Sequence, residues 1–527
     1  MVKPMRTKIT KLYLFVILAV SGTALIPIGR AQKSGAGFSP QIPKTWDEVA
    51  LAEWATPVAG LNQRPTHISA KEYYDLPVEN LRTYPVYFPG REPEGYWEML
   101  QRVGPKPLIE PEKLKSEADW INAGRVVFEE VDHLFLRTLD SKIIATARSL
   151  ETSKDAEPLP DGTVPSLRWV PTKSGVALSY SNCSNCHVLP LPSGARIPGA
   201  PEFGTGAGSQ DRARIPARSL RRLVYPANGV MDAVDAPFLT GPKPLGMRRY
   251  EAFGVPWLKN EDNERLKALT EAEDRELRAA FLRSGGLARW NGSLFYPAKM
   301  PDLIGVKDRK YFDHTATHLH REIGDLMRYA ALVSFADSGD FGPYHVLSSD
   351  TKRVQARLSD EALYALALYI YSLKPPPNPN PFDEKVKSGE KIFAREGCAA
   401  CHTPPLYTNN KLTLAEGFTP PKNAPKSLDI LPISVRTDPG LALRTRKGTG
   451  YYKVPSLKGV WYRGHYLHDG SVTSLEEMFE PKRLKKTHEP GGWSPPGQKT
   501  RAIKGHEFGL ELSAKDRQAL IAFLKTL

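Results

Sequence analysis

Two copies of a Cys-x-x-Cys-His motif contain every cysteine of this 527-residue chain: Cys183-Ser-Asn-Cys186-His187 and Cys398-Ala-Ala-Cys401-His402. Two thiols at this spacing can bond both vinyl groups of one porphyrin, and the next His can then bind the iron. The pattern therefore predicts two covalently attached c-type haems. A zinc site is the weaker alternative, because paired zinc motifs of this kind normally lie only about 15–20 residues apart.

The first residues are typical of a secretory signal. Several basic residues precede an apolar run from Leu12 to Val20, and small residues follow, with Ala24 and Ala31 as cleavage positions. Because bacteria attach haem c outside the cytoplasmic membrane, export and the cysteine motifs support each other. We expect a periplasmic or secreted protein. If the signal is retained, Leu12–Ile28 is at the short limit of a membrane span, and no other stretch predicts one.

The charge of the chain is strongly positive, with a formal value of +14, and it remains basic without residues 1–31. A basic surface would steer an acidic redox partner protein, and nothing in the sequence indicates nucleic acid. Two basic clusters could pair with haem propionates, although solvated surface is the favoured interpretation for most members. They are Arg212, Arg214, Arg218, Arg221 and Arg222, and Lys482, Arg483, Lys485 and Lys486.

Three segments recur in the same order in both halves of the chain, which indicates a duplication. Each pair shares a pattern: Gly four residues before Phe, a Lys-x-Pro-x-Leu-x-Gly-Val sequence, and a Ser before apolar residues at helical spacing. The pairs are Ala123–Phe128 with Ser388–Phe393, Lys299–Val306 with Lys453–Val460, and Leu358–Leu373 with Leu512–Leu527. We therefore expect a mainly α fold of two cytochrome c-like haem modules with extensive loops and an N-terminal wrap.

The same features divide the chain. The run from Lys374 to Pro381 cannot be helical, because five of its eight residues are Pro, and it would act as a stiff spacer. The predicted parts are a signal peptide (1–31), a loop-rich N-terminal extension (32–120), an N-terminal haem domain (121–373), a Pro-rich linker (374–384) and a C-terminal haem domain (385–527).

The segment Tyr452–Glu477, which contains His468-Asp469-Gly470, follows the second haem motif and resembles the bacterial dihaem cytochrome c peroxidase superfamily. The rubber oxygenase A-like proteins are the branch it is most similar to, on Tyr84–Pro93, Tyr311–Thr315, Ile323–Ala330 and Gly505–Gly509. The resemblance implies an N-terminal haem that reacts with a small oxidant, O2 or H2O2, and a C-terminal haem that transfers electrons. No motif identifies an organic substrate.

The resemblance also implies the iron ligands. His187 and His402 would be the proximal ligands, and His506 would be the second ligand of the C-terminal haem. Met478 and His488 are the alternatives for that second ligand, and a thioether would raise the reduction potential relative to an imidazole. A calcium ion between the domains is left open.

Tyr311-Phe312-Asp313 matches the place where these families have an aromatic-Trp-Asp sequence between the haems. Phe312 can pack there but is harder to oxidise than an indole. The peroxidases also have a distal Glu about 20 residues later, which handles the peroxide proton. The matching stretch Ala331–Phe335 has no carboxylate, which favours an oxygenase. Phe312 and His314 are therefore the predicted distal or inter-haem residues, and nearby polar residues could also turn inward: Asp313, His318, His320 and Arg321.

The leading hypothesis is an exported dihaem redox enzyme that activates dioxygen or peroxide. Three alternatives remain: a plain electron-transfer cytochrome, a dihaem cytochrome c peroxidase, and an accessory protein with a degenerate site. Two six-coordinate haems would favour the electron carrier, because ligand-saturated iron has no position for a substrate.

Overall fold

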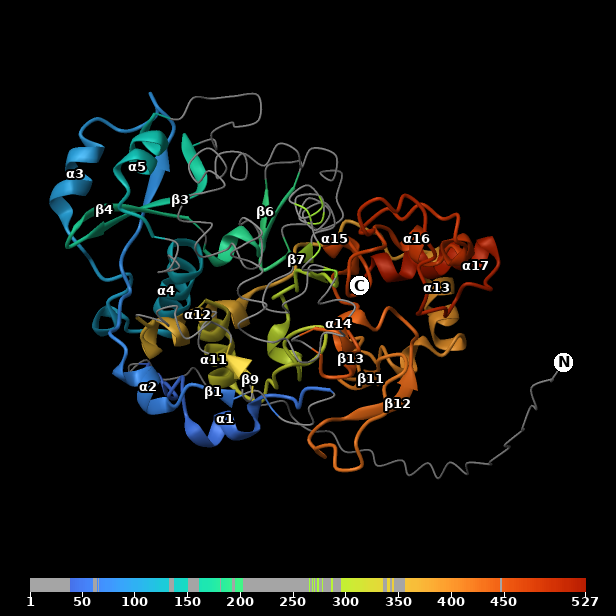
Figure 1. Cartoon of the computed structure of the whole chain (residues 1–527). Helices are drawn as coiled ribbons and strands as arrows, with labels where there is room; N and C mark the ends of the chain where they lie inside the picture. The colour runs from blue at the N-terminus through green and yellow to red at the C-terminus, as the bar shows by residue number, and fades with distance from the viewer. Residues whose placement is uncertain are drawn as a thin grey trace, which may run out of the picture. The chain divides into compact units, whose positions relative to one another are not determined.

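The computed structural model describes residues 38–59, 64, 66–131, 137–149, 161–180, 182–191, 195–201, isolated positions from 265 to 287, and 295–334, 339–341, 344–345, 356–445 and 448–527. Within these ranges, helices hold more residues than strands (Figure 1). The predicted signal peptide and the cluster Arg212–Arg222 lie outside the described residues.

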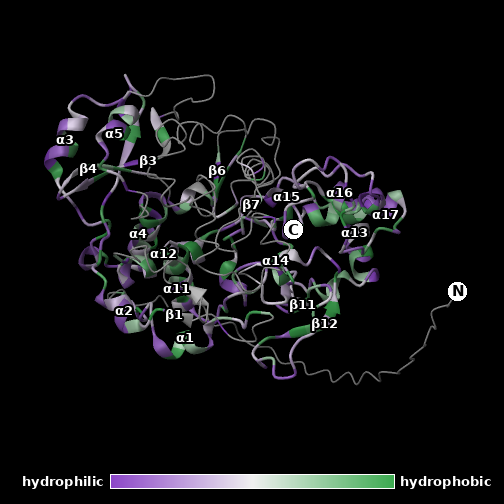
Figure 2. Ribbon diagram, in the orientation of Figure 1, coloured by the Kyte–Doolittle hydropathy of each residue, from purple (hydrophilic) through white to green (hydrophobic). Residues whose placement is uncertain are grey.

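Two helix pairs have the same design. Helix α4 (Glu117–Glu130) packs against α12 (Asp360–Ser372), and α13 (Glu384–Arg395) packs against α17 (Ala514–Lys525). In each pair the first helix precedes a haem motif, and the second ends one half of the predicted repeat. Helix α12 is hydrophobic along most of its length (Figure 2), which agrees with its many buried residues.

A glycine lies at the crossing point of each pair. A Cβ atom on Gly124 would lie 1.9 Å from the carbonyl oxygen of Ala365, and one on Gly389 would lie 2.0 Å from that of Ala519. Only a residue without a side chain allows two backbones to approach so closely. The glycines that the sequence comparison aligned therefore serve the same purpose in both halves.

The predicted N-caps of the two closing helices are confirmed. The Ser359 side chain accepts a hydrogen bond from the amide of Ala362, and that of Ser513 accepts one from Asp516. The described chain has no helix between Ser372 and Glu384, in agreement with the proline run. Helix α4 begins at Glu117, so the predicted boundary at residue 120 falls inside it.

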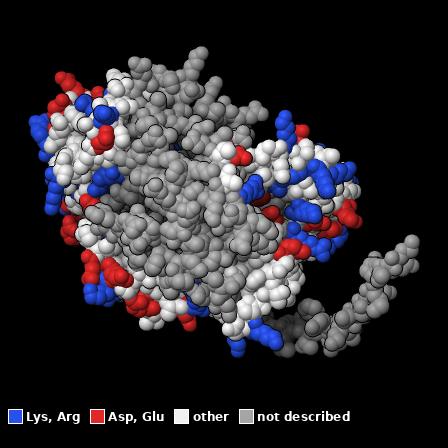
Figure 3. All heavy atoms as spheres, in the orientation of Figure 1, with Lys and Arg blue, Asp and Glu red and all other residues white. Residues whose placement is uncertain are grey.

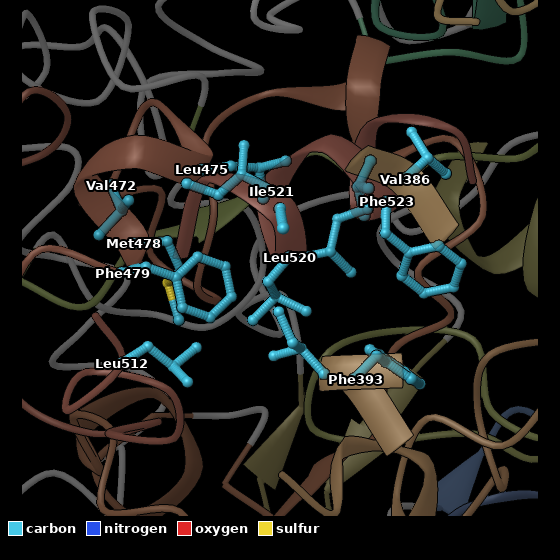
Figure 4. Close-up of a cluster of buried hydrophobic side chains, with 14 of the residues drawn as sticks. Val386, Phe393, Val472, Leu475, Met478, Phe479, Leu512, Leu520, Ile521 and Phe523 are labelled. Carbon is cyan, nitrogen blue, oxygen red and sulfur yellow. The ribbon is translucent and has the colours of Figure 1, made fainter. Parts of the chain in front are cut away.

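A hydrophobic cluster fills the space between α13, α17 and the chain that precedes α17 (Figure 4). Phe393 of α13 contacts Phe523 of α17, with ring centroids 5.4 Å apart. Phe128 and Tyr369 make the matching contact at 5.3 Å in the first pair. The packing of the two halves is thus equivalent in side chains as well as in backbone.

The N-terminal half contains a sheet that the sequence patterns did not predict. Strands β2 (Tyr84–Tyr87), β3 (Thr163–Thr172) and β4 (Gly175–Tyr180) form an antiparallel sheet. Strand β2 belongs to the extension, whereas β3 and β4 directly precede the first haem motif in the chain. The core beside this sheet includes the fully buried Trp169 and Phe88. The extension also forms helices α1 (Glu48–Trp54), α2 (Ala70–Asp75) and α3 (Tyr96–Val103), and α5 (Ser141–Arg148) packs near the sheet.

The remaining elements are short. After the first motif, β5 (Val188–Pro190) pairs with β6 (Arg196–Pro198), and in the second half β11 (Leu412–Leu414) lies between β12 (Ile430–Ser434) and β13 (Tyr451–Lys453). The others are α11 (Ile323–Ser334), α14 (Gly440–Leu443), α15 (Val460–Arg463), α16 (Leu475–Met478), β1 (Thr66–His67), β7 (Gly286–Leu287), β8 (Ala298–Lys299), β9 (Gly339–Phe341) and β10 (Tyr344–His345).

Candidate haem sites

Both Cys-x-x-Cys-His motifs form the same local structure. Cys183–Asn185 and Cys398–Ala400 are single 3-10 turns. In each, the amide of the final His donates to the carbonyl of the first Cys, at 3.1 Å for His187 and 2.9 Å for His402. The turn brings two thiols and an imidazole together within five residues, which is the donor set that covalent haem attachment requires.

His402 is oriented for binding a metal through Nε2. Its Nδ1 lies 3.2 Å from the carbonyl of Tyr407 and 3.1 Å from that of Pro455. A hydrogen on Nδ1 that is shared with these carbonyls leaves the lone pair on Nε2. Burial lowers the pKa of His402, which favours the neutral form that a metal ligand needs.

His506 faces His402. The centroids of the two rings are 6.2 Å apart. Two metal–nitrogen bonds of about 2.1 Å each would span about 4.2 Å, and the ring radii account for the rest of that separation. Burial, followed by the charge effects of His402 and Arg483, lowers the pKa of His506 to about 4. The geometry and the chemistry of this pair therefore fit a haem iron between two neutral imidazoles.

The backbone around His506 is held in an uncommon conformation. His506 has φ +47°, and Gly505 has φ +87° with no room for a side chain against the backbone of Thr437. The amide of His506 donates to the carbonyl of Val435 at 2.7 Å. A non-glycine residue at positive φ costs free energy, so the surrounding contacts must enforce this orientation of the imidazole.

The two alternative ligands have other contacts. Met478 packs in the hydrophobic cluster of Figure 4, beside Phe479. His488 is buried, and its Nε2 lies 3.0 Å from a carboxylate oxygen of Glu477. Of the two histidines among the candidates, His506 has its ring beside that of His402, whereas His488 contacts Glu477.

Arg483 differs from the rest of its basic cluster, for which the sequence predicted propionate contacts or, for most members, solvated surface. Its neighbours Lys482, Lys485 and Lys486 are exposed, and basic side chains are frequent around α16 and α17 (Figure 3), but Arg483 is fully buried. Its guanidinium donates to four backbone carbonyls, at 2.6 to 2.9 Å: those of Met478, Ile503, Gly505 and His506. Arg483 therefore fixes the loop that carries His506.

The first motif is tied to two distant parts of the chain. Asn182 donates through Nδ2 to the carbonyl of Glu129 at the end of α4, at 2.7 Å. The carbonyl of His187 accepts from the amide of Gly199, and the carbonyl of Gly199 accepts from that of Leu303. The segment after Lys299 therefore begins beside the N-terminal motif.

Phe312 is buried in an aromatic stack. Its ring lies parallel to that of Tyr329 at 4.5 Å and contacts that of His320 at 4.7 Å. His320 is held on both sides, with Nδ1 2.8 Å from the carbonyl of Arg309 and Nε2 2.6 Å from the hydroxyl of Tyr371. Phe312 is therefore packed in the core of the fold, against Tyr329 and His320.

His314 is partly buried, and its Nε2 lies 3.0 Å from the carbonyl of Lys299. Burial, helped by the charges of Lys299 and Lys453, holds the pKa of His314 well below its usual range. A neutral imidazole at this position can exchange a proton with a neighbour but carries no charge of its own.

The other predicted polar residues are engaged within the fold. Asp313 accepts hydrogen bonds from the amides of Thr315 and Thr317, both at 3.1 Å. Arg321 forms an ion pair with Asp325. His318 lies with its Nε2 3.3 Å from that of His67 in the N-terminal extension. The carboxylate of Asp325 in α11 thus binds the guanidinium groups of both Arg321 and Arg328.

Two lysines at equivalent positions of the repeat cross between the halves. Lys453 donates through Nζ to the carbonyls of Tyr311 and Phe312, and its amide donates to the carbonyl of His314. Lys299 donates through Nζ to the carbonyl of His465 at 2.8 Å, and its amide to that of His468.

Lys299 and Lys453 are as far apart in the sequence as His314 and His468 are, so His314 and His468 also occupy equivalent positions of the repeat. The amide of each lysine therefore bonds the equivalent histidine of the other half. Burial lowers the pKa of Lys299 to about 7. Since Pro455, two residues after Lys453, supplies a carbonyl to His402, this exchange connects the Phe312 loop to the C-terminal motif.

Among the described residues, no three His, Cys, Asp or Glu side chains gather where they could hold a metal ion, and calcium stays an untested prediction. In the same part of the chain no helix is both long and apolar enough to cross a bilayer.

Comparison with known proteins agrees with the sequence resemblance. The chain is 27% identical over 173 residues to cytochrome-c peroxidase IdrP1 of Pseudomonas sp. (strain SCT), covering 28% of this chain and 41% of that protein. It is 27% identical over 147 residues to methylamine utilization protein MauG of Methylorubrum extorquens, covering 27% of this chain and 34% of MauG.

Cytochrome-c peroxidase IdrP2 of Denitromonas iodatirespirans is 22% identical over 298 residues, 46% of this chain and 77% of that protein. The matches to the first two relatives thus span less than half of their lengths. No family model matches the chain. A MauG-like protein associated with microbial copper homeostasis has a TM-score of 0.21, with 18% identity over 32% of this chain and 56% of that structure.

These relatives indicate that the chain is a redox haem protein. The resemblance to the dihaem cytochrome c peroxidase superfamily is confirmed by them.

Proposed function

We propose that this chain is an exported dihaem c-type cytochrome and a haem oxidoreductase, with an N-terminal haem that reacts with dioxygen or peroxide and a C-terminal haem that transfers electrons. Haem, when bound, supplies one-electron chemistry and, where the iron has an open position, a binding site for the oxidant. The signal-like N-terminus supports export, and the named relatives support oxidoreductase chemistry.

The observation that carries the proposal is the pair His402 and His506. Two imidazoles that face each other would saturate the C-terminal iron, so that this site suits electron transfer and not substrate binding. The buried Arg483 binds the carbonyls of Gly505 and His506 and so holds His506 at its positive φ, which would keep the reorganisation on electron transfer small.

The N-terminal site would then be the place of reaction. His187 would bind the iron there, next to Cys183 and Cys186. By the family resemblance the stretch Ala331–Phe335, which has no carboxylate, would lie on the distal side, where it would exclude water without offering a base for peroxide. This supports dioxygen over peroxide as the oxidant, while the names of the relatives support peroxide.

The test is the optical and EPR spectrum of the purified protein, before and after dithionite, oxygen and peroxide. We expect one low-spin haem with two imidazole ligands and a second haem that responds to one of the oxidants. His506→Ala should change the first signal only, and His187→Ala the second only. His488→Ala is the matched control and should change neither.

A plain electron carrier would give two low-spin haems that ignore both oxidants, which would refute the enzyme proposal. An unchanged low-spin signal in His506→Ala would refute the ligand assignment alone. The mass of the mature protein tests export separately, because cleavage near Ala31 would remove the first 31 residues.

A further inference from the structure

A continuous line of aromatic rings leads from Phe312 into the N-terminal extension. Phe312 stacks on Tyr329 at 4.5 Å, Tyr329 lies 5.7 Å from His318, and His318 lies 4.1 Å from Trp54 between ring centroids. The first three rings belong to the segment after Lys299, whereas Trp54 ends helix α1.

The line continues within the extension. Trp54 lies 6.1 Å from Trp46, Trp46 stacks on Tyr73 at 4.7 Å, and Tyr73 lies 5.3 Å from Tyr74. Trp46, Trp54 and Tyr73 are buried, but Tyr74 is partly exposed. The line thus connects a buried ring, predicted to lie between the haems, with the surface of the protein.

The first and the last tyrosine of the line, Tyr329 and Tyr74, have carboxylate partners. The hydroxyl of Tyr329 donates to Oδ2 of Asp313 at 3.3 Å, and the hydroxyl of Tyr74 donates to Oδ2 of Asp360 at 2.8 Å. A phenol that loses an electron becomes a strong acid, so its proton must have an acceptor. In the described chain, the buried hydroxyl of Tyr73 has no hydrogen-bond partner, and an oxidising equivalent would not be trapped there.

Cations lie beside the line at two places. At its surface end the guanidinium of Arg357 lies 4.8 Å from the ring of Tyr74 and 3.9 Å from Asp360, and the ammonium of Lys44 lies 6.0 Å from the same ring. The guanidinium of Arg328 lies 5.9 Å from the ring of Trp54, where it would oppose a positive charge, but Asp325 binds that guanidinium at 2.5 Å. Packing alone would be satisfied by Phe or Leu at these positions. Beyond Phe312, the residues at each step except His318 are Tyr or Trp, the most easily oxidised aromatic side chains.

We propose that these rings form a hole-transfer route, by which oxidising equivalents from the haem centre leave the interior and oxidise external one-electron donors at Tyr74. This inference rests on the proposed function, with peroxide as the oxidant. In each transfer one electron moves inward from Tyr74 through Trp46, Trp54 and Tyr329. It then tunnels past Phe312 to the haem centre, so that the oxidising equivalent moves outward.

The electrons and protons balance as follows. Tyr74 loses one electron inward and its phenolic proton to Asp360, and an external donor then returns the electron while Asp360 returns the proton. One hydrogen peroxide takes up two electrons and two protons to give two waters. Each peroxide therefore corresponds to two donor molecules oxidised by one electron each.

The test treats the holoprotein with one equivalent of hydrogen peroxide and a nitroso spin trap, followed by mass-spectrometric mapping of the labelled residues. We expect a label on Tyr74. Trp54→Phe keeps an aromatic ring but interrupts the oxidisable line, and should reduce that label at least tenfold. Trp97→Phe is the matched control and should leave the label unchanged, because Trp97 lies outside the line, in an edge-to-face contact with Trp169 of the sheet at 5.0 Å.

The haem spectrum, recorded in the same samples, distinguishes the two proposals. If peroxide changes the spectrum and wild-type Tyr74 stays unlabelled, the route is refuted and the proposed function stands. A label on Tyr74 that is as strong in Trp54→Phe as in the wild type also refutes the route. If peroxide leaves the haem spectrum unchanged, peroxide chemistry is refuted and the route with it. Tyr329→Phe provides a second interruption if Trp54→Phe does not fold.

Discussion

The crossing of α13 and α17 at Gly389 allows a sharp prediction for Gly389→Ala. The added Cβ would lie 2.0 Å from the carbonyl oxygen of Ala519 and 2.8 Å from Cβ of Phe523. Both distances are shorter than Cβ contacts found in proteins, and the nearest obstacle is backbone, which cannot rotate away. The two helices must therefore move apart.

Two effects oppose each other. Alanine improves helix propensity over glycine by about 1 kcal/mol in a helix interior. Overpacking a well-packed core costs about 1–3 kcal/mol, and a backbone obstacle places this contact at the upper end of that range. Separation of the helices also weakens the contact between Phe393 and Phe523. We therefore expect a net loss of about 2 kcal/mol in the free energy of unfolding.

The assay is urea unfolding of the holoprotein, followed by far-UV circular dichroism and by haem absorbance. Ser388→Ala is the matched control, because Ser388 is exposed on the same helix and gains propensity without a clash. Gly389→Ala should unfold at a lower urea concentration with an unchanged slope. An equal or higher midpoint than that of Ser388→Ala would refute the close crossing.

The remaining predictions concern the loops around the sites. Arg483→Lys keeps the charge but loses the planar guanidinium that binds four carbonyls. We expect the free energy of unfolding to fall by about 2 kcal/mol and the EPR signal from the haem next to His506 to become heterogeneous. The exposed control Lys482→Gln should change neither, and an unaltered signal in Arg483→Lys would contradict its positioning role. Lys453→Met should cost about 1–3 kcal/mol, measured by urea unfolding, because buried carbonyls lose a charged donor; no loss would contradict the exchange between halves. His67 has its pKa lowered to about 4, mainly by burial, so the unfolded chain binds a proton between pH 6.5 and 4 that the folded chain does not. Stability should fall on acidification through this range, by up to about 1.4 kcal/mol per pH unit from His67, and His67→Gln should show a shallower pH dependence of unfolding; equal slopes would contradict the burial of a neutral imidazole.

Several features were predictable because they depend on residues close together in the chain. The haem motif spans five residues, and its Cys and His donors are brought together by a single turn. An N-cap such as Ser359 or Ser513 bonds an amide three residues later. The repeat was also visible in the sequence, because a glycine such as Gly389 is required wherever two helix backbones touch. The domain boundaries and the iron ligands stay predictions.

Other features depended on tertiary structure, since they join segments that the chain brings together only when it is folded. The sequence resemblance favoured His506 but left Met478 and His488 as alternatives, because which side chain approaches His402 depends on which loop folds back over it. The sequence could not separate Arg483 from its exposed neighbours, since a basic run looks the same whether a side chain points outward or into a ring of carbonyls.

The antiparallel sheet of β2, β3 and β4, and the aromatic line through Trp46 and Trp54, were likewise decided by packing. The pairing of β2 with β3 joins strands separated by α3, α4 and α5, and the contact of Trp54 with His318 joins the two ends of the N-terminal half. The sequence by itself determined the chemistry that each motif can perform, because that chemistry is local. Only the tertiary structure decided which distant side chains surround it, because burial and ring contacts arise from the folding of the whole chain.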